Sequence, residues 1–174
     1  MIRTSLTAMP RRGVVFAAKA VAFAVVAFVA GLVTCFGAFF LGQALMSGKH
    51  ISATLGQPNV LRAVIGGALF LTACGLLAFG LGMMLRHTAG AITASIALLF
   101  VAPLLVTFLP QAWQNDVNKW VPAYAGTQIF STRPDPADPG MSHMFSPWGG
   151  FAVLAGYAAA ALIGGMLAFL GRDA

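Results

Sequence analysis

Residues 60–109 decide the fold class, and they read VLRAVIGGALFLTACGLLAFGLGMMLRHTAGAITASIALLFVAPLLVTFL. The stretch holds two long apolar runs that are separated only by Arg86-His87-Thr88. A helix needs roughly 20 apolar residues to cross a bilayer, and each run is long enough. Because three residues leave room only for a tight turn, the stretch predicts an antiparallel hairpin of two transmembrane helices.

The composition extends this interpretation to the whole chain of 174 residues. Charged residues make up 8% and hydrophobic residues 59%, whereas soluble domains contain roughly 25% charged residues. So few charges cannot cover the apolar surface of a soluble domain of this length. The composition therefore argues against soluble, disordered and disulfide-stapled folds, and it predicts an all-α, polytopic membrane helix bundle.

Uncharged runs on either side of the hairpin predict two further spans. The four predicted spans cover residues 21–45, 60–85, 89–109 and 148–170. In the third span, Pro103 removes a backbone hydrogen bond, which predicts a kink. Residues 110–147 form a long outer connection, and its segment STRPDPADPG does not favour regular structure.

The outer connection begins with an amphipathic segment. Four apolar residues share one face of it, namely Trp113, Val117, Trp120 and Val121. This spacing of tryptophans predicts a short helix that lies in the membrane interface, with a lid over a substrate vestibule as the alternative.

The charges predict the orientation in the membrane. Ten Lys and Arg residues stand against four acidic residues, and the first 19 residues carry four basic residues and no acidic one. Cytoplasmic segments are enriched in Lys and Arg, so we expect a multi-pass protein of the plasma membrane with both termini in the cytoplasm. A twin-arginine signal is the alternative interpretation of Arg11-Arg12. Because the basic residues are scattered between apolar spans, we expect no nucleic-acid partner.

The sequence shows no candidate catalytic or metal centre. No predicted span has Asp, Glu or Lys at its centre, which argues against ion-coupled transport and against an intramembrane hydrolase. Arg62 lies near the outer end of its span, where its side chain can reach the headgroups. The remaining candidates are best explained as loop histidines and small packing residues: His50, His87, His143, Cys35 and Cys74. We therefore expect no cofactor and no enzymatic activity in this chain.

Small residues recur at every fourth position of the last predicted span: Ala152, Gly156, Ala160, Gly164 and Ala168. Such a stripe lets the backbone of another helix approach closely in a bilayer. The stripe predicts helix packing, either within the chain or against another subunit.

Several segments of the chain, in their order, resemble a known family. The N-terminus reads MIRTSLTAMPRRGVVFAAK, ISATLGQPNVLRAV precedes the second span, LRHTAGAI forms the tight turn, and SPWGGFAVLAGYAAAAL opens the last span. Together they resemble the permeases of type-2 ATP-binding-cassette (ABC) transporters. In that family an amphipathic cytoplasmic coupling helix precedes a membrane span and contacts a separate ATPase subunit.

The resemblance implies that residues 1–13 form a cytoplasmic coupling segment, in which Arg3, Thr4, Leu6 and Arg11 contact the ATPase. A basic segment beside the membrane can also bind anionic lipid. Members of the family usually have six spans, two of them before the coupling helix, so the resemblance implies that this chain lacks the first two.

The function that this implies is that of a permease subunit in an ATP-driven exporter. Its expected partners are a separate ATP-binding subunit, a second permease subunit (an identical copy or a different chain) and the lipid bilayer. The chain lacks the phosphate-binding pattern Gly-x-x-x-x-Gly-Lys-Ser/Thr, which agrees with ATP hydrolysis on a separate subunit. The alternatives are a membrane scaffold or accessory subunit and, less favoured, a small ion-coupled transporter. Drugs, lipids and peptides remain alternative substrates.

Overall fold

The chain is a bundle of helices, and the computed structural model describes residues 12–46, 56–85, 87–132 and 145–171. Four helical segments are long and apolar enough to cross a membrane. They are α2 (Arg12–Met46), α3 (Val60–Leu85), a third span made of α4 (Thr88–Ile96), η2 (Ala97–Val101) and α5 (Ala102–Val106), and α8 (Pro147–Gly171). The described residues contain no strand. The prediction of an all-α membrane protein with four spans is confirmed.

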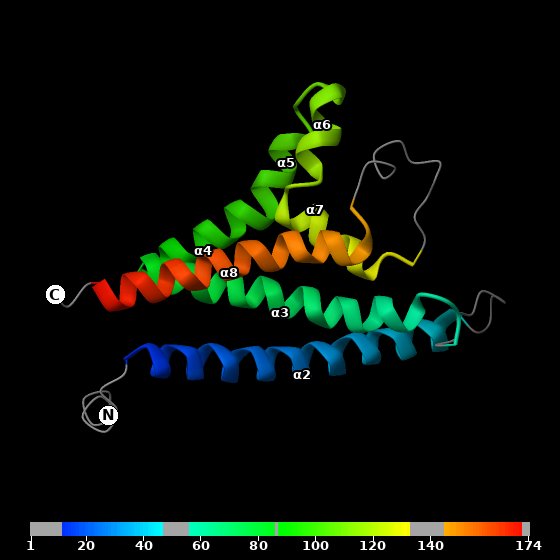
Figure 1. Ribbon diagram of the computed structural model, residues 1–174. Helices are drawn as coiled ribbons and strands as arrows, with labels where there is room; N and C mark the ends of the chain where they lie inside the picture. The colour runs from blue at the N-terminus through cyan, green and yellow to red at the C-terminus, as the bar shows by residue number, and fades with distance from the viewer. Residues whose placement is uncertain (1–11, 47–55, 86, 133–144, 172–174) are drawn as a thin grey trace.

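The helix α3 lies at the centre of the bundle (Figure 1). It packs against α2 on one side and against α8 on the other, while α2 and α8 barely touch each other. The third span starts beside the last turn of α3 and then diverges from the other three spans. The chain therefore forms a compact three-helix layer from which the third span projects.

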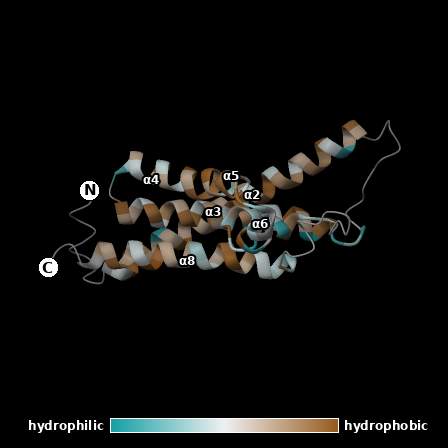
Figure 2. Ribbon diagram, turned by 90° about the horizontal axis from the view of Figure 1, so that it is seen from above, coloured by the Kyte–Doolittle hydropathy of each residue, from teal (hydrophilic) through white to brown (hydrophobic). Residues whose placement is uncertain are grey.

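Figure 2 shows hydrophobic residues along all of the long helices, with hydrophilic residues near α6 and at helix ends. The best-packed core lies between α3 and α8, where Ala73 and Leu77 of α3 meet Leu154 and Ala158 of α8. In contrast, only Phe16 and Gly31 are buried among the described side chains of α2. The long apolar surface of α2 is therefore left to the membrane or to a partner.

The third span is not a regular α-helix, because Pro103 interrupts its hydrogen bonds. The five residues of η2 form a π-helix that ends two residues before this proline, and the N–H of Ala102 donates to the carbonyl of Ala97, five residues earlier. The proline ring clashes with the carbonyl four residues before it, and a π turn is a common way to accommodate such a defect. The predicted disturbance at Pro103 thus takes the form of a π turn.

The third span ends at Val106, so the prediction that it continues to residue 109 is wrong. The N–H groups of residues 107, 108 and 109 donate to carbonyls only three residues earlier, at 3.0–3.2 Å, which tightens the last turn. The Gln114 side chain then donates to the carbonyls of Thr107 and Leu109, at 3.1 and 2.7 Å. Pro110 follows and disfavours helical backbone in the residue before it.

The connection after the third span contains more helix than the sequence predicts. A helix is present at the expected amphipathic segment as α6 (Gln111–Asn118), but it ends before Trp120 and Val121, so only two of the four predicted face residues lie on it. It is followed by α7 (Pro122–Thr127) and the 3₁₀ turn η3 (Gln128–Phe130). The predicted connection 110–147 thus contains two helical elements, α7 and η3, that we did not predict from the sequence. The predicted irregular segment STRPDPADPG lies mostly outside the described residues.

Candidate functional site

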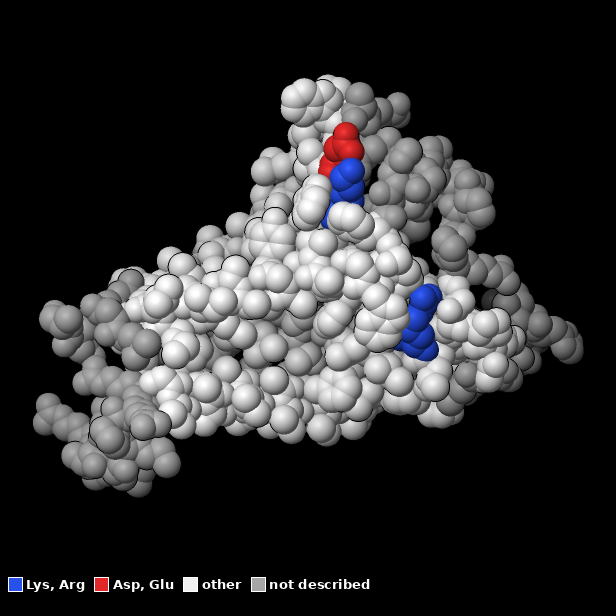
Figure 3. All heavy atoms as spheres, viewed as in Figure 1, with Lys and Arg blue, Asp and Glu red and all other residues white. Residues whose placement is uncertain are grey.

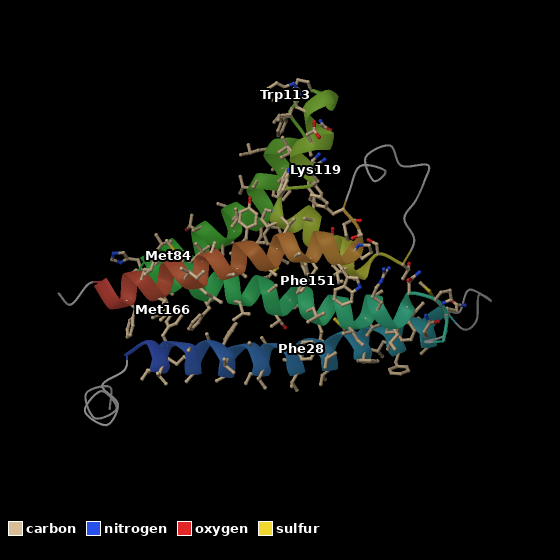
Figure 4. The ribbon with its side chains drawn as sticks, viewed as in Figure 1. Phe28, Met84, Trp113, Lys119, Phe151 and Met166 are labelled. Atoms are coloured by element: carbon tan, nitrogen blue, oxygen red, sulfur yellow. The ribbon has the colours of Figure 1, made fainter. Side chains whose placement is uncertain are left out.

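The residues expected to contact an ATPase, Arg3, Thr4, Leu6 and Arg11, lie outside the described part of the chain. Their role stays a prediction. The helix α2 begins at Arg12, so the last two residues of the expected coupling segment 1–13 are continuous with the first span. A Cβ atom on Gly13 would lie 3.0 Å from Cε of Met166, whose side chain points from α8 towards α2 (Figure 4). The first turn of α2 therefore packs against α8 near the end of that helix.

The small-residue stripe of α8 does not form the main contact with α3. Ala152, Gly156 and Ala160 are exposed, and a Cβ atom on Gly156 would meet nothing within 4 Å. Further along the stripe, Gly164 faces Met84 of α3, where a Cβ atom on the glycine would lie 2.8 Å from the methionine sulfur. The intramolecular interpretation therefore applies to the later part of the stripe, and a subunit contact stays a prediction for the first three residues.

The face of α8 that does pack on α3 carries Leu154, Ala158, Ala161 and Gly165, all of them buried. At Gly80 of α3 the two backbones come so close that a Cβ atom would lie 2.5 Å from the carbonyl carbon of Ala161. The sequence could not distinguish this face from the stripe, because α8 carries small residues on both.

The segment α7–η3 returns from α6 into the bundle, a feature that we did not predict from the sequence. It packs against α8, α3 and η2. Its buried residues are Pro122, Ala125, Gly126, Gln128 and Ile129. Glycines make the close approach possible: a Cβ atom on Gly66 of α3 would lie 2.7 Å from the carbonyl oxygen of Ile129. The available signal was the uncharged, small-residue sequence PAYAGTQIF between Lys119 and Arg133.

The helix α6 projects from the bundle and carries an ion pair. The ammonium group of Lys119 lies 2.7 Å from the carboxylate of Asp116, which is the only acidic residue that the structure describes. Trp113, at the far end of α6, is 65% exposed (Figure 4). Charged atoms on the face seen in Figure 3 form only small isolated patches. The placement of α6 in the membrane interface stays a prediction.

The remaining charged side chain of interest is Arg62, in the first turn of α3. Its Nη2 atom donates a hydrogen bond of 2.8 Å to the carbonyl of Ser131, just after η3. Its Nε atom is buried and has no hydrogen-bond partner. Arg62 lies near the end of its span, as expected. It also connects α3 to the residue that follows η3.

An apolar groove of about 560 Å³ lies next to this contact, between α2, α3 and η3. Small residues leave the space, including Cys35 and Ala38 of α2 and Gly67 of α3, and the rings of Phe39 and Phe130 line it. Cys35 packs towards Gly67, on which a Cβ atom would lie 3.0 Å from the sulfur. Both cysteines are free thiols, and among the described residues no three His, Cys, Asp or Glu side chains lie together as metal ligands.

In comparisons with known proteins, no family model, no curated protein and no solved structure matches the chain.

Proposed function

We propose that the chain is a permease subunit of an ATP-driven ABC exporter in the plasma membrane, with both termini in the cytoplasm. The observation that carries the proposal is the N-terminal sequence MIRTSLTAMPRRGVVFAAK directly before a membrane span, followed in order by the other segments that resemble this family. A separate ATPase would bind this basic segment. A movement of the bound segment would then displace α2, which begins at Arg12.

The distribution of charge favours this proposal over ion-coupled transport. The described residues of the four spans include no Asp or Glu, and their basic side chains lie towards helix ends. A transporter driven by protons or sodium ions generally needs an ionisable group near the middle of the membrane. A membrane scaffold or accessory subunit is the second candidate, since a closely packed α3–α8 pair would serve that role equally well.

Co-purification tests the proposed coupling. The tagged chain is produced together with a candidate ATPase subunit, and the complex is isolated from detergent-solubilised membranes. We expect the triple variant Arg3→Glu, Arg11→Glu, Arg12→Glu to lose the ATPase, because three positive charges at the proposed interface become negative. Unchanged recovery of the ATPase with this variant would show that the coupling assignment is wrong.

A matched triple reversal controls for net charge. The variant Lys49→Glu, Lys119→Glu, Arg133→Glu changes three basic residues that the charge pattern places on the other side of the membrane. We expect it to retain the ATPase. Equal loss of the ATPase in both triple variants would indicate a general effect of charge, and a chain that binds no ATPase at all would favour the scaffold.

A further inference from the structure

Arg62 occupies an unusual position for a charged residue. It is the third residue of α3, a helix of 26 residues that is about 39 Å long at 1.5 Å per residue. The hydrocarbon core of a bilayer is roughly 30 Å thick, so the first turn of α3 lies at the level of the lipid headgroups. The side chain is half-buried, and it makes no ion pair with any residue that the structure describes.

The hydrogen bonds of Arg62 also leave its charge uncompensated. A guanidinium group has five N–H donors in a planar fork. One of them binds the neutral carbonyl of Ser131, at 2.8 Å, and the Nε atom has no partner. The positive end of the α3 dipole lies beside the guanidinium, so the local potential favours an anion. An acceptor with several negatively charged oxygens, such as a phosphate, suits a planar donor group of this kind.

The apolar groove lies next to the hydrogen bond between Arg62 and Ser131. Val60 and Ala63, on either side of Arg62 in the sequence, line the groove, and so do Phe130 and Thr132, on either side of Ser131. The volume of about 560 Å³ falls in the range of roughly 300–1,000 Å³ that is typical of small-molecule sites. Apart from the hydroxyl of Thr132 and the thiol of Cys35, the side chains that line it are apolar. The groove is therefore suited to a hydrocarbon chain.

We propose that this groove binds an anionic glycerophospholipid, with one acyl chain between α2, α3 and η3 and the phosphate on Arg62. The bilayer supplies an amphiphile of this chemistry at the depth where Arg62 lies. A free phosphate would leave the groove empty, and a neutral lipid would leave the guanidinium without a counter-ion. The proposal does not depend on coupling to an ATPase.

The test measures lipid binding by the purified full chain in detergent, using native mass spectrometry. The probe is phosphatidylglycerol, compared with diacylglycerol that has the same acyl chains and with glycerol phosphate that has none. We expect phosphatidylglycerol to bind at least about tenfold more tightly than either, because only this lipid satisfies both the cation and the groove. Equal binding of diacylglycerol, or binding of glycerol phosphate with the same affinity, would overturn the proposal.

Two variants assign the binding to this site. Arg62→Gln removes the cation, and Ala38→Trp fills the groove from an exposed position of α2. Each is expected to weaken phosphatidylglycerol binding about tenfold or more. If Arg62→Gln does not elute as a folded protein in size-exclusion chromatography, the loss of phosphatidylglycerol binding in Ala38→Trp is sufficient to test the proposal.

The matched controls are Lys119→Gln, which removes the same charge from the ion pair on α6, and Ala22→Trp, an exposed position of α2 outside the groove. Both are expected to bind phosphatidylglycerol as the unmodified chain does. Binding that survives Ala38→Trp, or that falls equally in the controls, would show that the lipid is held elsewhere by general charge and hydrophobicity.

Discussion

Single glycines determine how closely the helices of this bundle approach one another. Gly80 lets α3 contact the backbone of α8 at Ala161, and Gly66 lets α3 contact the carbonyl of Ile129. Membrane helices gain little from the hydrophobic effect when they associate, because lipid tails are as apolar as leucine. Close van der Waals contact between backbones stabilises their association instead, so one added methyl group at such a position lowers the stability of the bundle.

We expect Gly80→Ala to destabilise the bundle. The added Cβ atom would lie 2.5–2.7 Å from backbone atoms of Ala161 and Leu162, which cannot move without separating α3 from α8. Overpacking costs about 1–3 kcal/mol, whereas alanine gains only about 0.8–1 kcal/mol over glycine in helix propensity. The net result is a lower Tm, which thermal unfolding of the purified chain in detergent would measure.

Gly37→Ala is the matched control for this prediction. Gly37 lies in α2, and a Cβ atom there would meet nothing within 4 Å. We expect its Tm to be unchanged or slightly higher, because only the gain in helix propensity remains. A Tm for Gly80→Ala at or above that of the control would contradict the close contact between α3 and α8.

At the scale of elements, the return of α7–η3 into the bundle is the main feature that separates this structure from a plain four-helix arrangement. The segment follows α6, a helix with an exposed tryptophan and an ion pair, yet Ile129 at its end is fully buried. The third span, which contains a π turn, diverges from α3 and ends at Val106. The segment α7–η3 then fills the space between the third span and the α3–α8 pair.

Cysteine labelling tests this arrangement and the proposed orientation together. In a chain with Cys35→Ala and Cys74→Ala, we expect a membrane-impermeant maleimide to label Trp113→Cys in intact cells but not Ile129→Cys. Trp113 is 65% exposed on a segment that we place outside the cell, whereas Ile129 is 0% exposed.

Denaturation provides the control for this experiment. Both variants should react equally once the protein is unfolded in detergent, because both then carry one accessible thiol. Rapid labelling of Ile129→Cys in intact cells would mean that α7–η3 does not enter the bundle. Labelling of Trp113→Cys only after the cells are opened would reverse the proposed orientation.

At the scale of the whole molecule, the chain leaves large apolar faces uncovered. The helix α2 contacts mainly α3, and the first part of the small-residue stripe on α8 faces outward next to Trp120 and Tyr157. The proposed role, a permease that works with a second permease subunit, would give one reason for such a face. The small side chains of the stripe would let the backbone of a second helix approach closely.

We expect Gly156→Leu to shift the purified chain from dimer towards monomer, because the leucine side chain would keep a partner helix at a distance. No atom of the chain lies within 4 Å of a Cβ atom placed on Gly156, so the variant should fold normally. Light scattering after size-exclusion chromatography in detergent would measure the mass of the complex.

Ala22→Leu serves as the control for the dimer. Ala22 is also exposed but lies on α2, so the same side chain is added to a different helix. We expect this variant to keep the oligomeric state of the unmodified chain. A monomeric unmodified chain, or a Gly156→Leu variant that remains dimeric, would rule out the stripe as the subunit contact.

The amino-acid sequence alone determined the membrane class, the number of spans and six of the eight span boundaries to within one residue. It placed the start of the first span nine residues too late and the end of the third span three residues too far along the chain. The sequence could determine the class and the spans because solvation by lipid is a local property: any run of about 20 uncharged, apolar residues must be helical to satisfy its backbone inside a bilayer. The helix α6 was predictable for a similar reason, since its amphipathic pattern repeats within a few residues.

Only the tertiary structure decided which faces meet. The helix α8 carries small residues on two faces. In the structure, the face with Leu154, Ala158 and Ala161 packs on α3, where Gly80 contacts Ala161, and the first part of the stripe does not. The burial of Ile129 against Gly66 and the bond between Arg62 and Ser131 join segments that lie far apart in the chain. Such contacts depend on shape complementarity between distant segments, which no local pattern of hydrophobicity or charge encodes.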